Sequence, residues 1–392
     1  MPWKETNVQE ERMKFIVAWN TGDWKMADLC REFGISRKTG YKYLERYREV
    51  GIEGLKDGSH AAHHQPNKTR PLIVELIVEE RERHPSWGPE TLLARLAGRY
   101  PQVKSWPAIS TVGEILKREG LIKKKRRRRR VNPSRPLPLA HVEWPNQVWC
   151  TDFKGHFTVG NGRRCDPLTI TDAHTRFLLE CRALQKTDSA HVRKAFERVF
   201  SEFGMPDTIR SDNGSPFASR GIAGLTPLAV WWLKLGIIPE RIEPGKPYQN
   251  GRHERMHLTL KQHTALPPRS SLKAQQEAFD RFRAEYNGVR PHHALGLETP
   301  ASQYRQSNRE YVARIRPLEY MTDREIFVVS DEGSIRYGVN RVGVGISLAG
   351  ETIALQEISE RHRRIEFACA VIGILDTYTG KVLAFKNPIP KD

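Results

Sequence analysis

An unbroken run of eight basic residues, Lys123–Arg130, limits what this chain can fold into. A block of like charges cannot pack into a core, and the sequence after it, VNPSRPLPLAH, is rich in proline. Such sequence is typical of an extended linker. The apolar pattern is helical before this run, whereas strands and helices alternate after it. We therefore expect a multidomain chain with domains over residues 1–58, 66–122, 144–310 and 317–392, and a basic linker over 123–143.

The charge of the whole chain indicates a polyanionic partner. The net charge is +18 over 392 residues, which favours nucleic acid or an anionic membrane surface. No apolar run approaches the roughly 18 residues of a membrane-spanning helix. The five cysteines are scattered and odd in number, and they include no CxxC pair. This usage argues against a disulfide scaffold and predicts a protein of the reducing cytoplasm.

The segment 1–58 has the pattern of a helix-turn-helix, centred on MADLCREFGISRKTGYKYLERY. Ala27 is expected where two helices cross, Gly34 in a left-handed turn, and Ser36 as the cap of the next helix. Tyr41 and Leu44 have the spacing of inward-facing residues. An ordinary helical hairpin with a solvated charged face is the alternative. The candidate DNA contacts of this helix are Arg37, Lys38, Tyr41, Lys42 and Arg46.

A second helical segment, 66–122, predicts a further helix-turn-helix or winged-helix-like domain. Pro85 ends one expected helix, Ser110 is expected to cap another, and Ile115 and Leu116 face inward. A plain three-helix bundle is the alternative. The candidate DNA contacts are Thr111 and Lys117 here, and Lys123, Lys124, Lys125, Arg126, Arg127, Arg128, Arg129 and Arg130 in the linker. His60, His63 and His64 lie between the two segments without the cysteine partners of a zinc site, which favours a polar linker.

Three acidic residues stand out in the mixed segment, whose order of strands and helices is that of an α/β ribonuclease H-like domain. Asp152 lies within an apolar strand, Asp212 ends another strand, and Glu254 lies in the first turns of a helix. Clustered carboxylates are stable when they share a cation, and hard oxygen ligands suit Mg²⁺ or Mn²⁺. Two such ions can serve phosphodiester chemistry. Taken singly, each acid could instead be a turn residue or a solvated helix charge.

Four ordered motifs give these acids a context. WCTDFKGHF, SDNGSPFAS, PYQNGRHERMHLTLK and YNGVRPHHALGLETPASQY resemble the integrase-like core of bacterial insertion-sequence transposases, the DDE branch that also includes retroviral integrases. The resemblance covers residues 144–304. It implies that Asp152, Asp212 and Glu254 are the catalytic, metal-binding triad. Asp172, a nearby competitor, is structural in similar proteins.

The spacing of the triad departs from the family in one place. The gap from Asp212 to Glu254 is 42 positions (254 minus 212), somewhat longer than is usual. The extra residues are expected in ASRGIAGLTPLA as a surface insertion. His257 and Lys261, on the Glu254 face of the helix, are candidate contacts to DNA phosphate or, alternatively, part of a solvated face. Arg290 and His292 are expected to be structural.

The resemblance also implies an activity and partners. The protein is expected to bind the inverted-repeat ends of its element, cleave their 3′ ends and join them to target DNA with two Mg²⁺ ions, for which Mn²⁺ can substitute. It implies a homo-oligomer on DNA, in the bacterial cytoplasm and associated with the nucleoid. Dependence on an accessory ATPase is left open. A structure-selective nuclease and a non-enzymatic DNA-binding regulator are the rival functions.

The tail from about residue 317 alternates short apolar segments with turns, which predicts a small β-barrel. Resemblance to integrases and related transposases implies an SH3-like barrel that contacts DNA or a neighbouring subunit. A module that serves only stability is the alternative.

Overall fold

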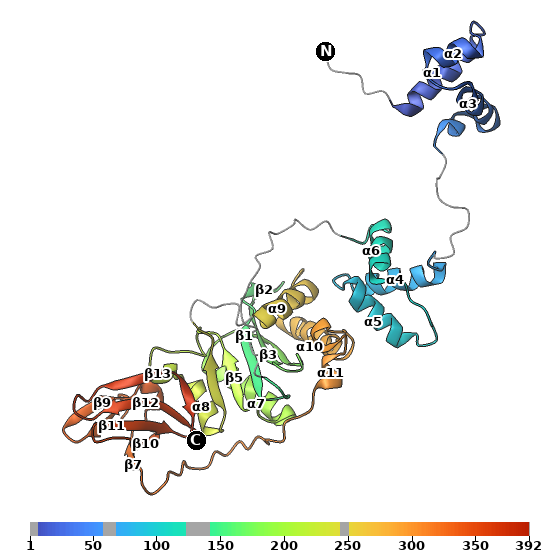
Figure 1. Cartoon of the computed structure of the whole chain (residues 1–392). Helices are drawn as coiled ribbons and strands as arrows, with labels where there is room; N and C mark the ends of the chain where they lie inside the picture. The colour runs from blue at the N-terminus through green and yellow to red at the C-terminus, as the bar shows by residue number, and fades with distance from the viewer. Residues whose placement is uncertain (1–6, 58–67, 123–141, 244–250, 392) are drawn as a thin grey trace. The chain divides into compact units, whose positions relative to one another are not determined.

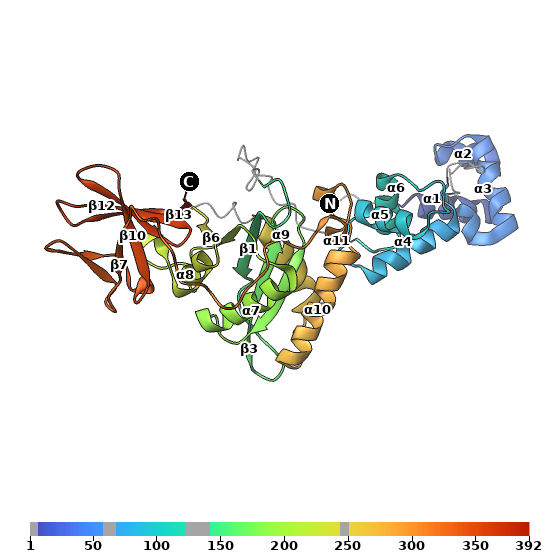
Figure 2. The same cartoon turned by 90° about the horizontal axis from the view of Figure 1, so that it is seen from below.

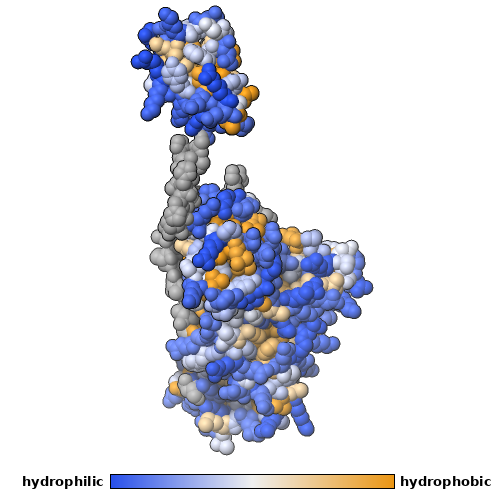
Figure 3. All heavy atoms as spheres, turned by 90° about the vertical axis from the view of Figure 1, so that its right-hand side faces the viewer, coloured by the Kyte–Doolittle hydropathy of each residue, from blue (hydrophilic) through white to orange (hydrophobic). Residues whose placement is uncertain are grey.

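A computed structural model describes residues 7–57, 68–122, 142–243 and 251–391 (Figure 1). The chain divides into two compact units, residues 1–69 and 70–392, and each is considered by itself. Within the described ranges, no helix is both long and apolar enough to cross a membrane. On the face seen in Figure 3, hydrophilic residues predominate and hydrophobic residues form smaller patches. The basic run Lys123–Arg130 and the histidines His60, His63 and His64 lie outside the described residues.

The first unit is a helix-turn-helix. Its elements are α1 (Val8–Asn20), α2 (Met26–Glu32), α3 (Arg37–Val50) and the 3₁₀ turn η1 (Gly51–Leu55). Gly34 takes a left-handed φ of +63°, as its place in the turn predicts. The Ser36 side chain accepts a hydrogen bond from the backbone N–H of Thr39 at 3.1 Å, which confirms it as the cap of α3.

Two expectations for this unit are wrong. Ala27 is exposed, and the close approach occurs at Gly40 instead, where a Cβ would lie 2.6 Å from the Cys30 Sγ. Tyr41 is 55% exposed rather than inward, because Gly40 and Leu44, one helical turn apart, form the buried stripe of α3. The exposed position leaves Tyr41 among the candidate DNA contacts.

The second helical module consists of α4 (Pro71–Arg83), α5 (Pro89–Arg99) and α6 (Ile109–Arg118). Ile115 and Leu116 are buried as expected, beside Trp87 in a core of their own. The expected cap is wrong: Ser110 lies inside α6, whose N-cap is Ala108 and receives no side-chain hydrogen bond. The apolar face of the helix, rather than the nearest serine, determines where α6 begins.

The segment that begins at residue 142 is built on a mixed sheet. Its strands are β1 (Val148–Phe153), β2 (Phe157–Thr158), β3 (Arg164–Asp172), β4 (Leu178–Leu184), β5 (Thr208–Ser211) and β6 (Ile238–Arg241). The order is β2-β3-β1-β5-β6, with β4 paired to β3. The pairs β1–β3 and β3–β4 are antiparallel, whereas β1–β5 and β5–β6 are parallel.

Helices cover both faces of this sheet (Figure 1). The helices are α7 (Ser189–Phe203), α8 (Pro227–Lys234), α9 (Gly251–Thr264), α10 (Leu272–Gly288) and the short α11 (Pro300–Gln303). Leu179 packs with α7 and α8, whereas its neighbour Leu178 packs with α9 and α10. Adjacent residues of β4 thus serve opposite layers, as the alternation of a strand requires. This is the expected α/β arrangement of an integrase-like core.

The expected C-terminal barrel is not confirmed. The strands are β7 (Glu325–Val328), β8 (Ser334–Tyr337), β9 (Asn340–Gly343), β10 (Thr352–Glu357), β11 (His362–Phe367), β12 (Ala370–Asp376) and β13 (Val382–Pro390). Five of them form an open sheet, β13-β12-β11-β10-β7, and β8 and β9 form a separate hairpin. Figure 2 shows β13 on the side of this sheet nearest β6 and α8. Residues of both sheets share one hydrophobic cluster, which includes Trp232 of α8 and Phe367 of β11.

The segment after Asp212 is not a surface insertion, contrary to the expectation from the family spacing. Ile222, Ala223 and Gly224 form a buried 3₁₀ turn, η2. The side chain of Ile222 reaches the C-terminal sheet, since a Cβ on Gly373 would lie 3.3 Å from its Cδ1. Residues 222–226 are buried, with the downstream sheet against Ile222, whereas Arg220 and Gly221 before them are exposed.

Candidate active site

Two of the predicted acids lie at the same end of neighbouring parallel strands, Asp152 within β1 and Asp212 directly after β5. The β1–β5 register pairs Val148 with Thr208 and Cys150 with Arg210, a constant offset of 60 positions. Asp152 is two residues beyond Cys150, and Asp212 is two residues beyond Arg210, so each acid follows the last paired residue of its strand by the same number of positions. The parallel pairing therefore directs both aspartates to one end of the sheet.

The chain turns tightly around the Asp212 carboxylate. The Gly214 N–H donates to the Asp212 Oδ1 at 3.1 Å, and a Cβ on Gly214 would lie only 3.0 Å from the Oδ2. The Asn213 Nδ2 donates to the Ile242 carbonyl at 2.9 Å, which ties the turn to the end of β6. Burial raises the pKa of Asp212, against the opposing effect of the Gly214 amide. A carboxylate that has lost part of its hydration is stabilised by a nearby cation.

Asp152 lies beside a buried polar cluster on α9. The Thr169 hydroxyl, on β3 opposite Asp152, donates to the Asp152 carbonyl at 3.1 Å. The same oxygen lies 2.6 Å from the His253 Nε2 and 2.7 Å from the His257 Nε2. The His257 Nδ1 is 3.9 Å from the Asp152 Oδ2. One hydroxyl thus joins the backbone of the Asp152 strand to two consecutive turns of α9.

The hydrogen atoms available for bonding in this cluster determine the tautomers of His253 and His257. Burial lowers the pKa of His253 to about 3 and that of His257 to about 2, so both imidazoles are neutral at pH 7. A hydroxyl has one proton, and the Asp152 carbonyl can only accept it. Both imidazoles therefore donate to Thr169 through Nε2–H. The histidines fix the position of α9 as neutral hydrogen-bond donors.

Glu254 lies in the first turn of α9, between those histidines in sequence, and its side chain is exposed. The residues that the structure describes contain no group of three His, Cys, Asp or Glu side chains placed to hold a metal ion. The two aspartate strands are thus brought together, whereas the three predicted carboxylates do not close into a ligand set. Their chemistry still fits Mg²⁺, since carboxylate oxygens from β1, from the residue after β5 and from α9 are hard ligands.

The predicted DNA contacts have different environments. On α3, Arg37, Lys38, Tyr41 and Lys42 are exposed and Arg46 is half-buried. A second set is exposed as well, namely Thr111 and Lys117 on α6 and Lys261 on α9. Lys117 pairs with Glu114 at 3.5 Å. His257 differs from the expectation of an exposed contact to phosphate, because its ring is buried against Thr169.

Sequence reasoning missed His253 and Thr169. The available signal was the i, i+4 pair in HERMH, since His253 and His257 lie on the same face as the buried Met256 and Leu260. Asp172 has the structural role expected of it. Its carboxylate is fully buried and accepts from the Asn146 N–H, the Thr175 N–H and the Thr175 hydroxyl, each at 2.7 Å.

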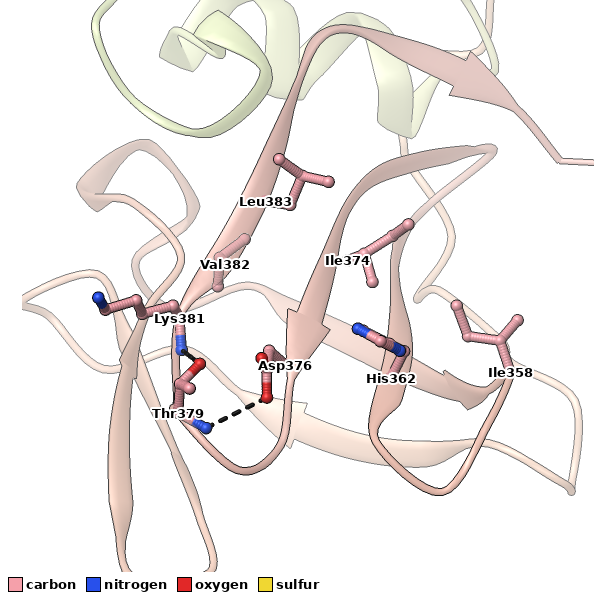
Figure 4. A pocket seen from close by; sticks show the side chains of 8 residues that line it. All are labelled: Ile358, His362, Ile374, Asp376, Thr379, Lys381, Val382 and Leu383. Carbon is pink, nitrogen blue, oxygen red and sulfur yellow. Dashed lines mark hydrogen bonds between the residues drawn. The ribbon is translucent and has the colours of Figure 1, made fainter.

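A groove of about 580 Å³ lies on the C-terminal sheet (Figure 4). Its one carboxylate, Asp376, is already bound: it accepts from the Arg361 Nη2 at 2.6 Å and from the Thr379 N–H at 3.2 Å. The Arg361 guanidinium lowers the pKa of Asp376. The remaining lining is mostly aliphatic, including Ile374 and Leu383. The groove does not offer the paired acids that metal-dependent chemistry on phosphodiesters needs.

Comparison with known proteins identifies the architecture. Models of the integrase core domain match residues 143–247 and 235–300. A helix-turn-helix domain model matches residues 11–63, and a homeodomain-like model matches residues 39–116. A protein of insertion element IS476 from Xanthomonas euvesicatoria is 26% identical over 72% of this chain and 79% of its own length. A protein of IS407 from Burkholderia multivorans is 28% identical over 48% of this chain and 65% of its own length.

These matches support a bacterial insertion-sequence transposase with an integrase-like core. The matched integrase residues of this transposase include Asp152, Asp212 and Glu254. Its helix-turn-helix domains bind DNA, as the same comparisons indicate.

Solved structures of viral integrases are more distant from the transposase. The catalytic core of HTLV-2 integrase in complex with magnesium is 18% identical, over 41% of this chain and 97% of that one, with a TM-score of 0.32. A simian T-cell lymphotropic virus intasome in complex with a regulatory subunit of PP2A is 12% identical, over 82% of this chain and 98% of that one, with a TM-score of 0.36.

Proposed function

We propose that this transposase cleaves the 3′ ends of its element and joins them to target DNA, with Asp152, Asp212 and Glu254 as the metal-binding catalytic residues. The observation that supports the proposal is the parallel register of β1 and β5, since Asp152 and Asp212 each lie two residues beyond its last pair, Cys150 and Arg210. The helix with Glu254 is attached beside them through Thr169.

The chemistry consists of two phosphoryl transfers. Water attacks the phosphodiester at the element end, and the bond to the 3′ oxygen breaks, which frees a 3′-hydroxyl. That hydroxyl then attacks a phosphodiester of the target, so that a new bond to the element end forms as the target strand breaks. Two Mg²⁺ ions, or Mn²⁺ in their place, supply activation of the attacking oxygen and stabilisation of the leaving oxygen when bound. Asp152 and Asp212 would hold these ions, and Gly214 keeps the backbone close to Asp212.

DNA recognition is assigned to the exposed basic faces. We propose that Arg37, Lys38, Tyr41, Lys42 and Arg46 of α3 contact the inverted repeats, with Thr111, Lys117, the linker 123–143 and Lys261 on flanking phosphate. The domains are then 1–58, 66–122, 144–310 and 317–392. Since two ends must meet for integration, the active form is a homo-oligomer on DNA. The location that follows is the bacterial cytoplasm, on the nucleoid.

Replacement of one acid tests the catalytic assignment. Asp152→Asn is expected to retain binding to a duplex with the inverted repeats that flank the gene, while Mg²⁺-dependent cleavage falls at least ~10³-fold, because the amide removes a charged oxygen ligand. Asp207→Asn is the matched control, an exposed aspartate before β5 that pairs with Arg309. Normal cleavage by Asp152→Asn would refute the triad. Joined products in a plasmid target distinguish the transposase from a nuclease.

Replacement of the α3 face tests end recognition. Ala at Arg37, Lys38 and Lys42 together is expected to weaken binding to the end duplex and to lower the salt slope by up to about 3, since each lost phosphate contact accounts for about 0.9. Fluorescence anisotropy at several salt concentrations measures both quantities. If affinity and slope match those of the unaltered chain, α3 is not the recognition helix.

A further inference from the structure

The residues that follow Asp212, 213–226, form a long turn that is held along its whole length. At its start, the Asn213 Nδ2 donates to the Ile242 carbonyl at 2.9 Å. In its middle, the Arg241 Nη2 donates to the Ala223 carbonyl at 3.1 Å. At its end, the Ser347 hydroxyl donates to the Leu225 carbonyl at 2.9 Å. Ser347 belongs to the C-terminal sheet region, so two distant parts of the chain fix one turn.

Arg241 is the central residue of this arrangement. It ends β6 directly opposite Ser211, the residue before Asp212. Its guanidinium fills the space above Gly224, where a Cβ would overlap it, and Gly224 has a left-handed φ of +65°. The position of the η2 turn therefore depends on where this guanidinium lies.

Arg241 is held in turn by the last strand of the chain. The Asn387 Oδ1 accepts from both the Arg241 N–H and the Arg241 Nε, each at 3.2 Å. The Asn387 Nδ2 donates back to the Arg241 carbonyl at 3.4 Å. One amide side chain thus joins the backbone and the side chain of Arg241.

A bulge in β13 presents Asn387 to β6. The register pairs Val371 with Ile389 and then Gly373 with Ala384. Four residues of β13, 385–388, therefore oppose the single residue 372 of β12. Bulges of this kind bend an edge strand and redirect its side chains, and they often lie next to active sites. Here the bulge carries Asn387 to the end of β6.

We propose that Asn387 and Arg241 are positioning residues for Asp212, so that the C-terminal sheet is a structural part of the catalytic site. The proposal rests on the assignment of Asp212 as a metal ligand. Asn387 orients Arg241, Arg241 fixes the Ala223 carbonyl, and the turn is thereby held as a closed unit beginning at Asp212. A turn of this length without these contacts would regain backbone freedom at its Asp212 end.

The test uses the full chain with three single variants. Asn387→Ala removes the amide, and Asn387→Asp retains the acceptor toward the Arg241 N–H and Nε. Asn340→Ala is the matched control, an asparagine of the hairpin strand β9 that lies against Gly380. Hydrogen exchange of peptides covering 213–226 measures the order of the turn. Electron paramagnetic resonance with Mn²⁺ alone measures metal affinity, and anisotropy on the end duplex measures DNA binding.

Asn387→Ala is expected to speed exchange in 213–226 by about 10-fold, since two to three hydrogen bonds are lost. It is expected to weaken Mn²⁺ binding by about 10- to 100-fold, the usual effect of removing a residue that orients metal ligands. Binding to the end duplex stays within about 2-fold, because α3 is unchanged. Asn387→Asp and Asn340→Ala stay close to the unaltered chain in every measurement.

Two results would overturn the proposal. Unchanged exchange in 213–226 would show that Asn387 does not hold the turn. Faster exchange with unchanged Mn²⁺ affinity would show that the turn does not position Asp212. If exchange also rises throughout the C-terminal sheet, Ser347→Ala is measured as well. It removes only one contact, at the far end of the turn, and so distinguishes loosening of the turn from loosening of the whole sheet. Failure of the unaltered chain to bind Mn²⁺ would instead count against the proposed function. The exchange measurement would still test whether Asn387 and Arg241 hold the turn 213–226.

Discussion

The hydroxyl of Thr169 links α9 to the strand that carries Asp152. It lies within 3.1 Å of the Asp152 carbonyl and within 2.7 Å of both buried imidazoles. Thr169→Val replaces this hydroxyl by a methyl group of nearly the same size, so the change creates no cavity. What it removes is the shared acceptor of two Nε2–H groups.

The expected cost follows from those two donors. An imidazole N–H left buried without an acceptor costs about 1–3 kcal/mol. His253 and His257 are both buried, and neither can turn to water without displacing the helix. Added apolar contact from the new methyl group offsets part of the loss, by up to about 1 kcal/mol. With that offset, we expect Thr169→Val to destabilise the segment by about 1–5 kcal/mol and to reduce cleavage, because α9 carries Glu254.

A neighbouring threonine provides a matched control. Thr151 precedes Asp152 on β1 and is equally buried, but among the described residues its Oγ1 has no hydrogen-bond partner. Removal of an unpaired buried hydroxyl is neutral or stabilising. Thr151→Val is therefore expected to change stability by no more than about 1 kcal/mol, and in the stabilising direction.

Hydrogen exchange of the full chain in increasing urea separates the catalytic segment from the helical unit 1–69. The free energy of opening is read from peptides of β1, β3 and α9, and cleavage is measured on the end duplex. Equal stability of the two variants, or a loss below about 0.5 kcal/mol for Thr169→Val, would refute the assignment of Thr169 as the acceptor of both imidazoles.

Two further predictions follow from packing and from titration. Gly40→Ala places a Cβ 2.6 Å from the Cys30 Sγ and 2.9 Å from the Phe15 ring, so overpacking outweighs the gain in helix propensity and destabilises the first unit by about 1–2 kcal/mol. Gly113→Ala in α6, where the space is open, should instead stabilise its helix by up to about 1 kcal/mol, and thermal unfolding distinguishes the two. Burial lowers the pKa of His292 to about 4, below its unfolded value near 6.5, so its contribution is present above pH 6.5 and is lost as the pH falls toward 4. Denaturation at pH 7 and at pH 5 measures how much the free energy of unfolding falls on acidification. This fall should be about 1–2 kcal/mol smaller in His292→Gln than in the unaltered chain, and equal falls would contradict a buried neutral imidazole.

Local chemistry made the turns of the first unit predictable from sequence. The left-handed conformation of Gly34 and the capping role of Ser36 depend on the few residues around them, and both were predicted correctly. Tyr41 was misplaced as an inward residue because α3 carries several aromatic residues, and the side that is buried depends on its partner helices. Gly40 lies against Cys30 and Phe15, which periodicity within α3 alone cannot reveal.

The two aspartates were predicted through motifs, and the structure gives the physical reason for their spacing. Their separation of 60 positions equals the register offset of β1 and β5. A spacing alone cannot indicate this, because the register depends on how β5 pairs. His257 was misinterpreted because a histidine on a helix suits a phosphate contact and a buried hydrogen bond equally well. Only the packing of α9 on Thr169 distinguishes these roles.

One physical cause accounts both for the barrel that is not confirmed and for the buried turn after Asp212. Alternating apolar residues predict strands but not closure, since closure requires the two edge strands to pair with each other. In this transposase one edge strand, β13, lies against β6 through Asn387, and β7 remains at the opposite edge. The same contact covers η2, which the family spacing predicted at the surface. An edge strand is stable when it is paired or covered. The segment after Asp212 and the end of β6 cover this edge, so the open sheet and the buried insertion require each other.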